Sequence, residues 1–176
     1  MIFTETKLPG SFLIEPESLT DERGFFARTW CQREFAAHGL EPRLAQCSVS
    51  LNLRRGTLRG MHYQARPCTE VKLVRCTQGA LYDVILDLRP GSATFQHWVA
   101  FELDARNHRL LYIPAGCAHG FQTLQDETEV FYQISEFYAP ERARGARWND
   151  PAFHIEWPLA DPILSARDRA WPDFEA

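Results

Sequence analysis

The chain has 176 residues, of which 45% are apolar, and 19 Lys and Arg residues stand against 23 Asp and Glu residues, a formal net charge of −4. This is an ordinary globular composition, and the length suits one domain with a sizeable core. The slight acidic surplus argues against a nucleic-acid partner, and no apolar stretch approaches the roughly 20 residues that cross a bilayer. Residues 1–5 lack the basic and apolar regions of a secretory signal, so we expect a cytoplasmic protein without a membrane partner.

The predicted elements are mostly short β-strands. A short helix is expected at residues 31–38, and between about residues 44 and 135 short apolar runs alternate with turn signals at roughly the 8 to 12 residue spacing of a sandwich or barrel. Residues 80–89 and 128–135 alternate most clearly between two faces. A second short helix is expected at residues 165–170. Because many short antiparallel strands must protect their edges, we predict an all-β fold, a double-sheet jelly roll with a few short helices near the termini. We see no domain break within residues 1–176.

The five cysteines are odd in number and widely spaced, so they indicate neither a CxxC metal knuckle nor a disulfide framework. They are Cys31, Cys47, Cys68, Cys76 and Cys117. We therefore expect reduced thiols that act mostly as small, half-buried hydrophobic side chains.

Two histidine motifs bear on a metal site. Residues 114–119 read Pro-Ala-Gly-Cys-Ala-His, which is similar to the PxGxxH turn of metal-binding cupins. The HxH pair that completes such a site is missing, because His62 is followed by Tyr63 and Gln64. We expect no metal ion, which leaves His62 and His119 free for proton transfer or hydrogen bonding.

The stretch Leu58–Gln64 carries the densest chemistry in the chain. Strict alternation along a strand would send Arg59 and His62 to opposite faces, but Gly60 lies between them, and an interior glycine often marks a β-bulge that redirects a side chain. With a bulge, both side chains line one pocket. The alternative is a solvated Arg59 and a core histidine whose hydrogen bonds are satisfied.

Lys72 shares a predicted strand face with Val74 and Cys76, where an unpaired ammonium group is costly. A buried lysine therefore indicates an anionic partner or ligand. The alternative is an edge-strand lysine that discourages aggregation.

Two further segments have both a functional and a structural interpretation. Arg23 stands next to Phe25 and Phe26, a combination suited to a phosphate and a stacked ring. Asp168 follows Ser165 at the start of the second predicted helix, where it also fits the acidic position of a capping box.

Taken together, these segments resemble the dTDP-4-dehydrorhamnose 3,5-epimerase family of RmlC-like cupins, nearly from end to end. The stretches that carry the resemblance are residues 5–10, 21–26, 58–64, 72–76, 113–121, 131–132, 138–141, 145–151 and 164–168. The resemblance implies a homodimer of jelly rolls that epimerises a nucleoside-diphosphate 4-keto-6-deoxy sugar without a metal ion or organic cofactor. It further implies a jelly-roll core at about 44–135, an N-terminal dimerisation arm and a C-terminal segment that closes the site.

The resemblance also implies a role for individual residues. The general base matches His62, the acid that orients it matches Asp168, and the opposing proton donor matches Tyr132. The remaining matches are His119 as the second histidine, Lys72 near the keto oxygen, Arg59 at the diphosphate, and Arg23, Phe26, Gln46 and Tyr138 at the nucleotide, with Arg23 and Phe26 reaching the site of the partner subunit.

The departures from the family pattern lie at the nucleotide end. Arg28 replaces a common glutamate, and Gln46-Cys47-Ser48-Val49-Ser50 replaces the usual Gln-Asp-Asn-His-Ser. These departures leave open a GDP- or CDP-linked sugar. Motifs do not record which carbons are inverted, so a monoepimerase acting at C3 or C5 alone also remains an alternative. A non-catalytic sugar-nucleotide-binding cupin, a metal-dependent cupin and a cupin ketoisomerase are the alternatives from other classes.

Overall fold

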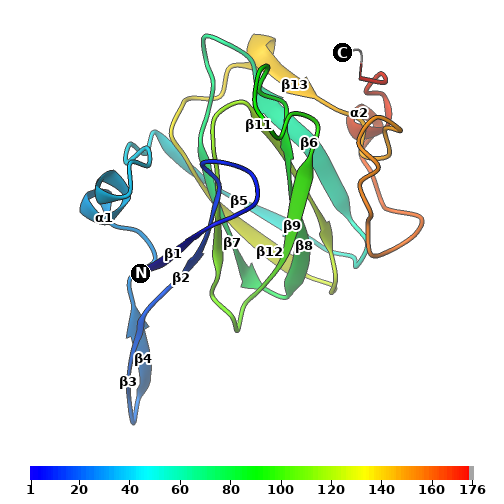
Figure 1. Ribbon diagram of the computed structural model, residues 1–176. Helices are drawn as coiled ribbons and strands as arrows, with labels where there is room; N and C mark the ends of the chain where they lie inside the picture. Colours follow the sequence, from blue (N-terminus) through cyan, green and yellow to red (C-terminus); the bar gives the residue numbers. More distant parts are fainter. Residues whose placement is uncertain (175–176) are drawn as a thin grey trace.

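The computed structural model describes residues 1–174 and consists mainly of two facing β-sheets (Figure 1). The strands are β1 (Ile2–Glu5), β2 (Phe12–Glu15), β3 (Ser18–Asp21), β4 (Gly24–Ala27), β5 (Gln46–Asn52), β6 (Leu58–Gln64), β7 (Lys72–Gln78), β8 (Ala80–Asp87), β9 (Trp98–Asp104), β10 (Leu110–Ile113), β11 (Cys117–Thr123), β12 (Thr128–Ile134) and β13 (Ala143–Gly145). Helices α1 (Gln32–Ala37) and α2 (Ala166–Arg169) and a 3-10 turn at Pro140–Arg142 complete the elements.

The six-stranded sheet has the order β1-β2-β10-β7-β12-β5, and the five-stranded sheet has the order β13-β6-β11-β8-β9. All pairings within both sheets are antiparallel. This arrangement confirms the predicted double-sheet jelly roll, and both predicted helices are present. Strands β1, β2 and β13 extend the sheets beyond residues 44–135.

The main core lies between the two sheets. Val74 and Val130 of the six-stranded sheet pack there with Leu81, Ile85 and Phe121 of the five-stranded sheet, and all five side chains are buried. Alternation along each strand sends one set of side chains into this layer and the other set outward. Strand β8 is buried on both faces, because the C-terminal segment covers the outer face of its sheet.

Strand β6 contains the β-bulge that Gly60 predicts. Arg59 pairs with Phe121 and His62 with His119, so three residue steps on β6 oppose two on β11. Gly60 has a φ of +143°, and a Cβ atom there would lie 2.5 Å from the Cα atom of Gly120. Only glycine fits this position, and the bulge turns Arg59 and His62 toward the same cavity.

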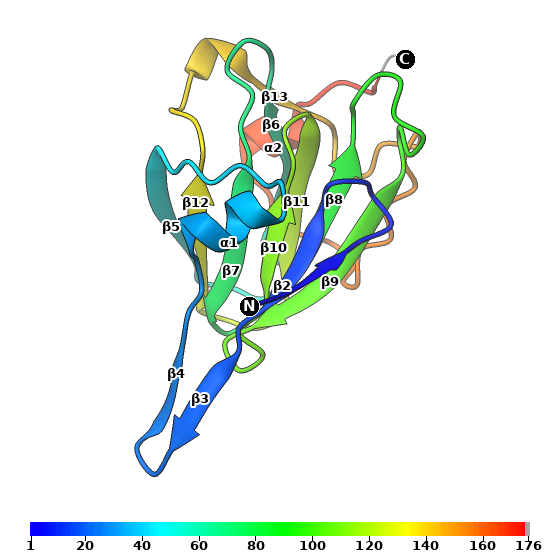
Figure 2. The ribbon, with the colours of Figure 1, turned by 60° about the vertical axis from the view of Figure 1, so that its left-hand side comes forward.

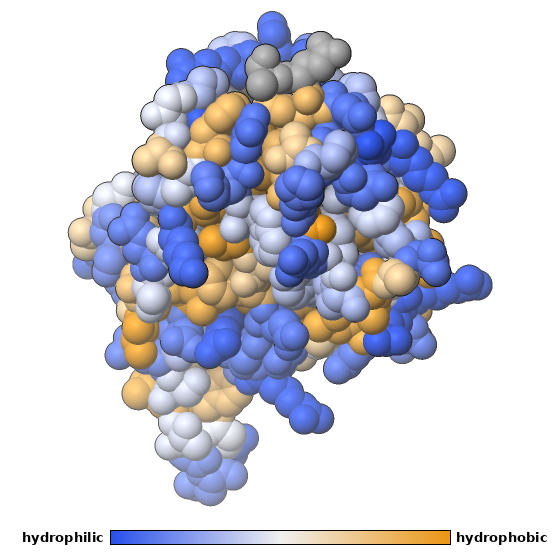
Figure 3. Space-filling model, turned by 45° about the vertical axis from the view of Figure 1, so that its right-hand side comes forward, coloured by the Kyte–Doolittle hydropathy of each residue, from blue (hydrophilic) through white to orange (hydrophobic). Residues whose placement is uncertain are grey.

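The hairpin β3–β4 projects away from the two sheets, as seen from two directions (Figures 1 and 2). Its two strands pair only with each other. The side chains of Leu19 and Phe26 are 73% and 72% exposed, and the protrusion at the lower edge of the molecule shows apolar colour between polar side chains (Figure 3). These two side chains thus offer apolar surface to water.

Candidate active site

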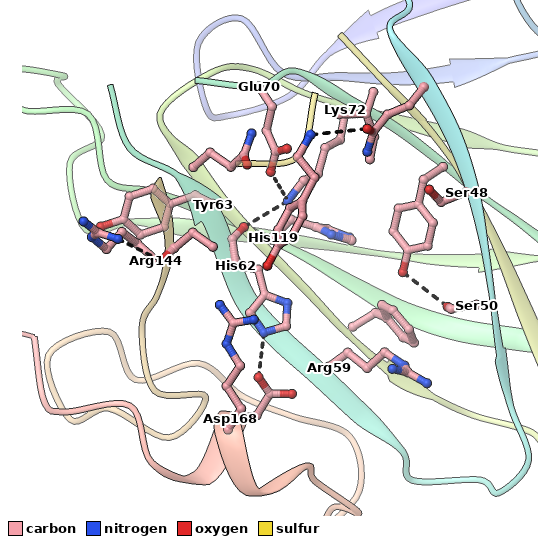
Figure 4. A pocket seen from close by; sticks show the side chains of 18 of the residues that line it. Ser48, Ser50, Arg59, His62, Tyr63, Glu70, Lys72, His119, Arg144 and Asp168 are labelled. Atoms are coloured by element: carbon pink, nitrogen blue, oxygen red, sulfur yellow. Dashed lines mark hydrogen bonds and ion pairs between the residues drawn. The ribbon is translucent and has the colours of Figure 1, made fainter. Parts of the chain in front are cut away.

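A cavity of about 590 Å³ opens between the sheets, and its side chains come from strands of both sheets and from the segment around α2 (Figure 4). Eight of the ten side chains predicted for the site line this cavity: Gln46, Arg59, His62, Lys72, His119, Tyr132, Tyr138 and Asp168. The other two, Arg23 and Phe26, lie on the projecting hairpin β3–β4. The fold therefore brings the predicted proton-transfer groups of one chain together in this cavity. The predicted residues of the arm, Arg23 and Phe26, do not line it.

His62 and Asp168 form a hydrogen-bonded pair at the cavity wall. The His62 Nε2 atom lies 2.6 Å from Asp168 Oδ1, and the His62 side chain is 38% exposed whereas Asp168 is buried. Burial alone would raise the pKa of Asp168, but the hydrogen bond with His62, the interaction with the His62 charge and hydrogen bonds with Ser165 and Trp171 together outweigh it, and the pKa lies below its ordinary value. This carboxylate is therefore ionised at neutral pH.

The start of helix α2 places Asp168 beside His62. The Ser165 side chain accepts a hydrogen bond from the Asp168 backbone N–H, so Ser165 is the N-cap that the sequence predicts. This cap uses the Asp168 main chain. The Asp168 carboxylate remains free for His62.

Lys72 is buried in the middle of a sheet. Strand β7 lies between β10 and β12, so the edge-strand interpretation of this lysine is wrong. Its Nζ atom lies 2.9 Å from Glu70 Oε1 and donates a hydrogen bond to the His62 carbonyl oxygen at 3.1 Å. An ammonium group has three N–H donors, so a further donor remains for a ligand in the cavity.

Glu70 is not among the site residues that the sequence predicts. Its side chain is 10% exposed, as is that of Lys72, and it lines the cavity. Because a buried lysine needs an anionic partner, burial of Lys72 indicates a nearby carboxylate. Glu70 lies only two residues before Lys72.

His119 has a carboxylate partner of its own. Its Nε2 atom bonds to Asp83 of β8, and both side chains are buried. The His119 ring lies edge-on to the Tyr132 ring, with centroids 6.2 Å apart. Asp83 is a second residue that the sequence does not predict for the site, although it lies between Leu81 and Ile85 on the inward-facing side of its strand.

Within residues 1–174, no three His, Cys, Asp or Glu side chains group closely enough to hold a metal ion.

Tyr132 faces the cavity from the six-stranded sheet, whereas His62 and His119 belong to the five-stranded sheet. Burial raises the pKa of Tyr132 well above its ordinary value of about 10, and the Ser50 hydroxyl, 3.5 Å from the phenol oxygen, only partly offsets this effect. The phenol is therefore protonated at neutral pH. The site holds an acid on one sheet and an imidazole–carboxylate pair on the other.

Polar groups line the cavity on both sides of Tyr132. The Arg59 Nε atom donates to Asn52 Oδ1 at 2.7 Å, and the Tyr138 backbone N–H donates to Gln46 Oε1 at 3.3 Å. Tyr138 is 54% exposed, at the open side of the site. The cavity thus offers a guanidinium group and an aromatic ring, which suit a phosphate and a base.

The residues that depart from the family pattern divide between the cavity and the surface. Ser48 lines the cavity, whereas Cys47 and Val49 are exposed on the other face of β5. Arg28 pairs with Glu34 at 2.8 Å. The Arg23 side chain is 83% exposed and its guanidinium group contacts Asp21. In the monomer, the arm residues therefore lie outside the cavity.

One cavity of this jelly roll holds a buried phenol and an imidazole–carboxylate pair on opposite walls, beside a buried lysine. These groups define a cupin enzyme of the isomerase class that moves protons on its substrate. The chain belongs to the dTDP-4-dehydrorhamnose 3,5-epimerase family, whose model matches residues 5–176.

Similar proteins agree with this assignment. The dTDP-4-dehydrorhamnose 3,5-epimerase of Pseudomonas aeruginosa is 46% identical over 173 residues, which cover 97% of this chain and 94% of that protein. The crystal structure of the Bacillus anthracis enzyme with TDP and PPi bound superposes with a TM-score of 0.95 at 40% identity, covering 98% and 99% of the two chains. A 3'-monoepimerase from Streptomyces bikiniensis, in complex with dTDP-quinovose, gives a TM-score of 0.88 at 34% identity, covering 96% of this chain and 85% of that one.

In the described part of the chain, no helix is both long enough and apolar enough to span a membrane.

Proposed function

We propose that this chain is a cofactor-independent epimerase of a nucleoside-diphosphate 4-keto-6-deoxy sugar, and that its reaction is the 3,5-epimerisation of dTDP-4-dehydro-6-deoxyglucose in dTDP-L-rhamnose biosynthesis. The observation that carries the proposal is the position of His62 and Tyr132 on opposite sheets around one cavity. Inversion of a carbon requires a proton to leave from one face and another to arrive on the opposite face. Groups on opposite walls meet this requirement.

His62 acts as the base. A C–H bond beside a ketone is a weak acid, so its proton moves near neutral pH only if a well-placed base accepts it and the charge on the keto oxygen is stabilised. The ionised Asp168 carboxylate fixes the imidazole tautomer and stabilises the imidazolium that forms. Lys72 donates to the oxygen of the enolate, and a donor of this kind commonly contributes about 3 kcal/mol.

Tyr132 acts as the acid. Its raised pKa keeps the phenol protonated until a carbanion forms opposite it, and the phenol then transfers its proton to that carbon. The phenolate left behind recovers a proton from solvent, and the His62 imidazolium returns its proton to solvent before the next turnover. His119, held by Asp83, lies beside Tyr132 and offers a hydrogen bond to the sugar ring from the five-stranded sheet.

The nucleotide binds in the same cavity. Arg59 contacts the diphosphate and fixes the sugar ring relative to His62, while Gln46 and Tyr138 contact the nucleoside. Arg23 and Phe26 join the site from the partner subunit of a homodimer in the cytoplasm. The exposure of both side chains on a projecting hairpin supports this arrangement, because a large apolar side chain such as Phe26 is stabilised when a partner covers it.

The decisive experiment incubates the protein with dTDP-4-keto-6-deoxyglucose in heavy water and follows deuterium at C3 and C5 by NMR. We expect exchange at both carbons together with the inverted product. Exchange at one carbon alone would favour a monoepimerase, which the likeness to the Streptomyces 3'-monoepimerase makes the second candidate. Absence of exchange, with intact binding of dTDP, would refute the enzymatic proposal.

The nucleotide is tested separately, because Arg28 and Ser48 depart from the family pattern. Binding of dTDP, CDP, GDP and UDP is compared by calorimetry. We expect dTDP to bind most tightly. Tighter binding of GDP or CDP would reassign the substrate without changing the proton chemistry.

A further inference from the structure

Arg59 lines the cavity without forming an ion pair with any described residue. Six arginines form ion pairs with a carboxylate: Arg23, Arg28, Arg43, Arg89, Arg109 and Arg147. Arg59 instead donates from Nε to the neutral amide oxygen of Asn52, at 2.7 Å. Over residues 1–174, no carboxylate lies within ion-pair distance of Arg59. Its guanidinium group therefore lines the cavity with no ion-pair partner among these residues.

Asn52 is itself rigidly fixed. It is the last residue of β5 and is 2% exposed. Its side-chain nitrogen donates to the carbonyl oxygens of Ser50, at 3.4 Å, and of Thr128 on β12, at 3.0 Å. With Arg59 of β6 bonded to its oxygen, one amide connects the two sheets at the cavity. Both hydrogens and the oxygen of this amide are used, so its orientation is determined.

We propose that Asn52 is a positioning residue that aims the Arg59 guanidinium at the diphosphate while leaving its charge intact. The inference rests on the proposed function, in which the diphosphate is the anion that binds Arg59. The bond at Nε leaves the two terminal amino groups of the fork free for bidentate contact with phosphate oxygens. An aspartate in place of Asn52 would hold the same N–H group, but it would cancel the charge and repel the ligand.

The test compares Asn52→Ala, Asn52→Asp and Arg59→Ala by calorimetric binding of dTDP at low salt. We expect dTDP affinity to fall about 5-fold in Asn52→Ala, because Arg59 keeps its charge but loses its orientation, and about 30-fold in Asn52→Asp. Raising the salt concentration should narrow the difference between the two variants, since salt screens the added charge.

The Arg59→Ala background distinguishes positioning from a merely structural role. Both Asn52 variants lose the two hydrogen bonds that the Asn52 side-chain nitrogen donates, so a structural role predicts the same loss of dTDP affinity with or without Arg59. Asn107→Asp is the matched control, because it makes the same change of charge in the turn before Arg109, away from the cavity. We expect it to leave dTDP binding unchanged.

A double-variant cycle completes the test. In the Arg59→Ala background, Asn52→Ala should cause no further loss of dTDP affinity. A further 5-fold loss in that background, or a larger loss for Asn52→Ala than for Asn52→Asp, would overturn the inference. If Asn52→Asp fails to fold, the alanine cycle alone decides. Wild-type affinity in Arg59→Ala would overturn both the inference and the diphosphate role of Arg59, whereas failure of the proposed function appears separately as absence of deuterium exchange by the wild type.

Discussion

Replacing Asp168 by asparagine separates its two interpretations, as the partner of the His62 base and as part of a helix cap. The cap itself is a bond from the Asp168 backbone N–H to Ser165 Oγ, which asparagine retains. The substitution also retains the size of the side chain. What it removes is the negative charge 2.6 Å from His62 Nε2, which stabilises the imidazolium formed when the base takes a proton.

The size of the effect follows from this contact. A hydrogen bond to a charged group contributes about 1.5–3 kcal/mol, and each 1.36 kcal/mol changes a rate tenfold. We therefore expect Asp168→Asn to lower the rate of deuterium incorporation beside the ketone roughly 10- to 150-fold at saturating substrate. The melting temperature should stay within about 5 °C of the wild type, because the cap is unchanged. NMR in heavy water and thermal unfolding measure the two quantities.

A second buried carboxylate supplies the control. Asp150 accepts hydrogen bonds from the backbone N–H groups of Ala152 and Phe174 and does not line the cavity. Asp150→Asn should therefore lower the melting temperature by several degrees and leave the exchange rate unchanged. The reasoning about Asp168 is refuted if Asp168→Asn exchanges within about threefold of the wild type, or if its loss of stability matches that of Asp150→Asn.

Tyr132→Phe should retain exchange catalysed by His62 but slow formation of the inverted product at least tenfold, since removal and return of the proton use different groups; product NMR showing equal loss of both would contradict this. Glu70→Ala should lower the exchange rate about 5-fold because Lys72 loses an acceptor that orients it, and Glu70→Gln should recover most of the rate. No recovery in the glutamine variant would exclude an orienting role. Burial alone would raise the pKa of Asp87, but hydrogen bonds from Arg89, Ser92 and Thr94 hold it well below its usual range. Its contribution to stability is present above the unfolded value of about 3.9 and is lost as the pH falls below it, so the free energy of unfolding in urea should decrease from pH 5 to pH 3 less steeply in Asp87→Asn than in the wild type. Equal slopes would show that this carboxylate is not a main source of acid sensitivity.

Local features of the fold were predictable where one segment contains all the necessary information. The helices at 31–38 and 165–170 are present as α1 and α2, and Ser165 caps the second as expected. The bulge at Gly60 follows from one glycine between two polar residues. The strand predicted at residues 80–89 ends at Asp87, because the Asp87 carboxylate accepts bonds from the Arg89 side chain and backbone and so begins a turn.

The parts of the site that escaped prediction depend on which strands are neighbours in space. Asp83 meets His119 because β8 pairs with β11, and Asn52 meets Arg59 because the ends of two different sheets approach each other. Spacing along the chain contains neither fact. Glu70 is different. A buried lysine indicates an anionic partner, so an acidic group near Lys72 was expected, but the sequence analysis did not identify Glu70 as that group.

The architecture also explains why Tyr132, and not His119, suits the proposed role of the acid. His62 and His119 are cross-strand partners on β6 and β11, so they approach a substrate from the same sheet. Tyr132 belongs to β12 of the facing sheet. Two packed sheets lie about 10 Å apart, a gap that accommodates one sugar ring between side chains of opposite walls. A proton removed by His62 and returned by His119 would re-enter on the face it left, which restores the original configuration; a proton returned by Tyr132 inverts it. The separation of the two sheets is therefore what makes the site suited to epimerisation and not to exchange alone.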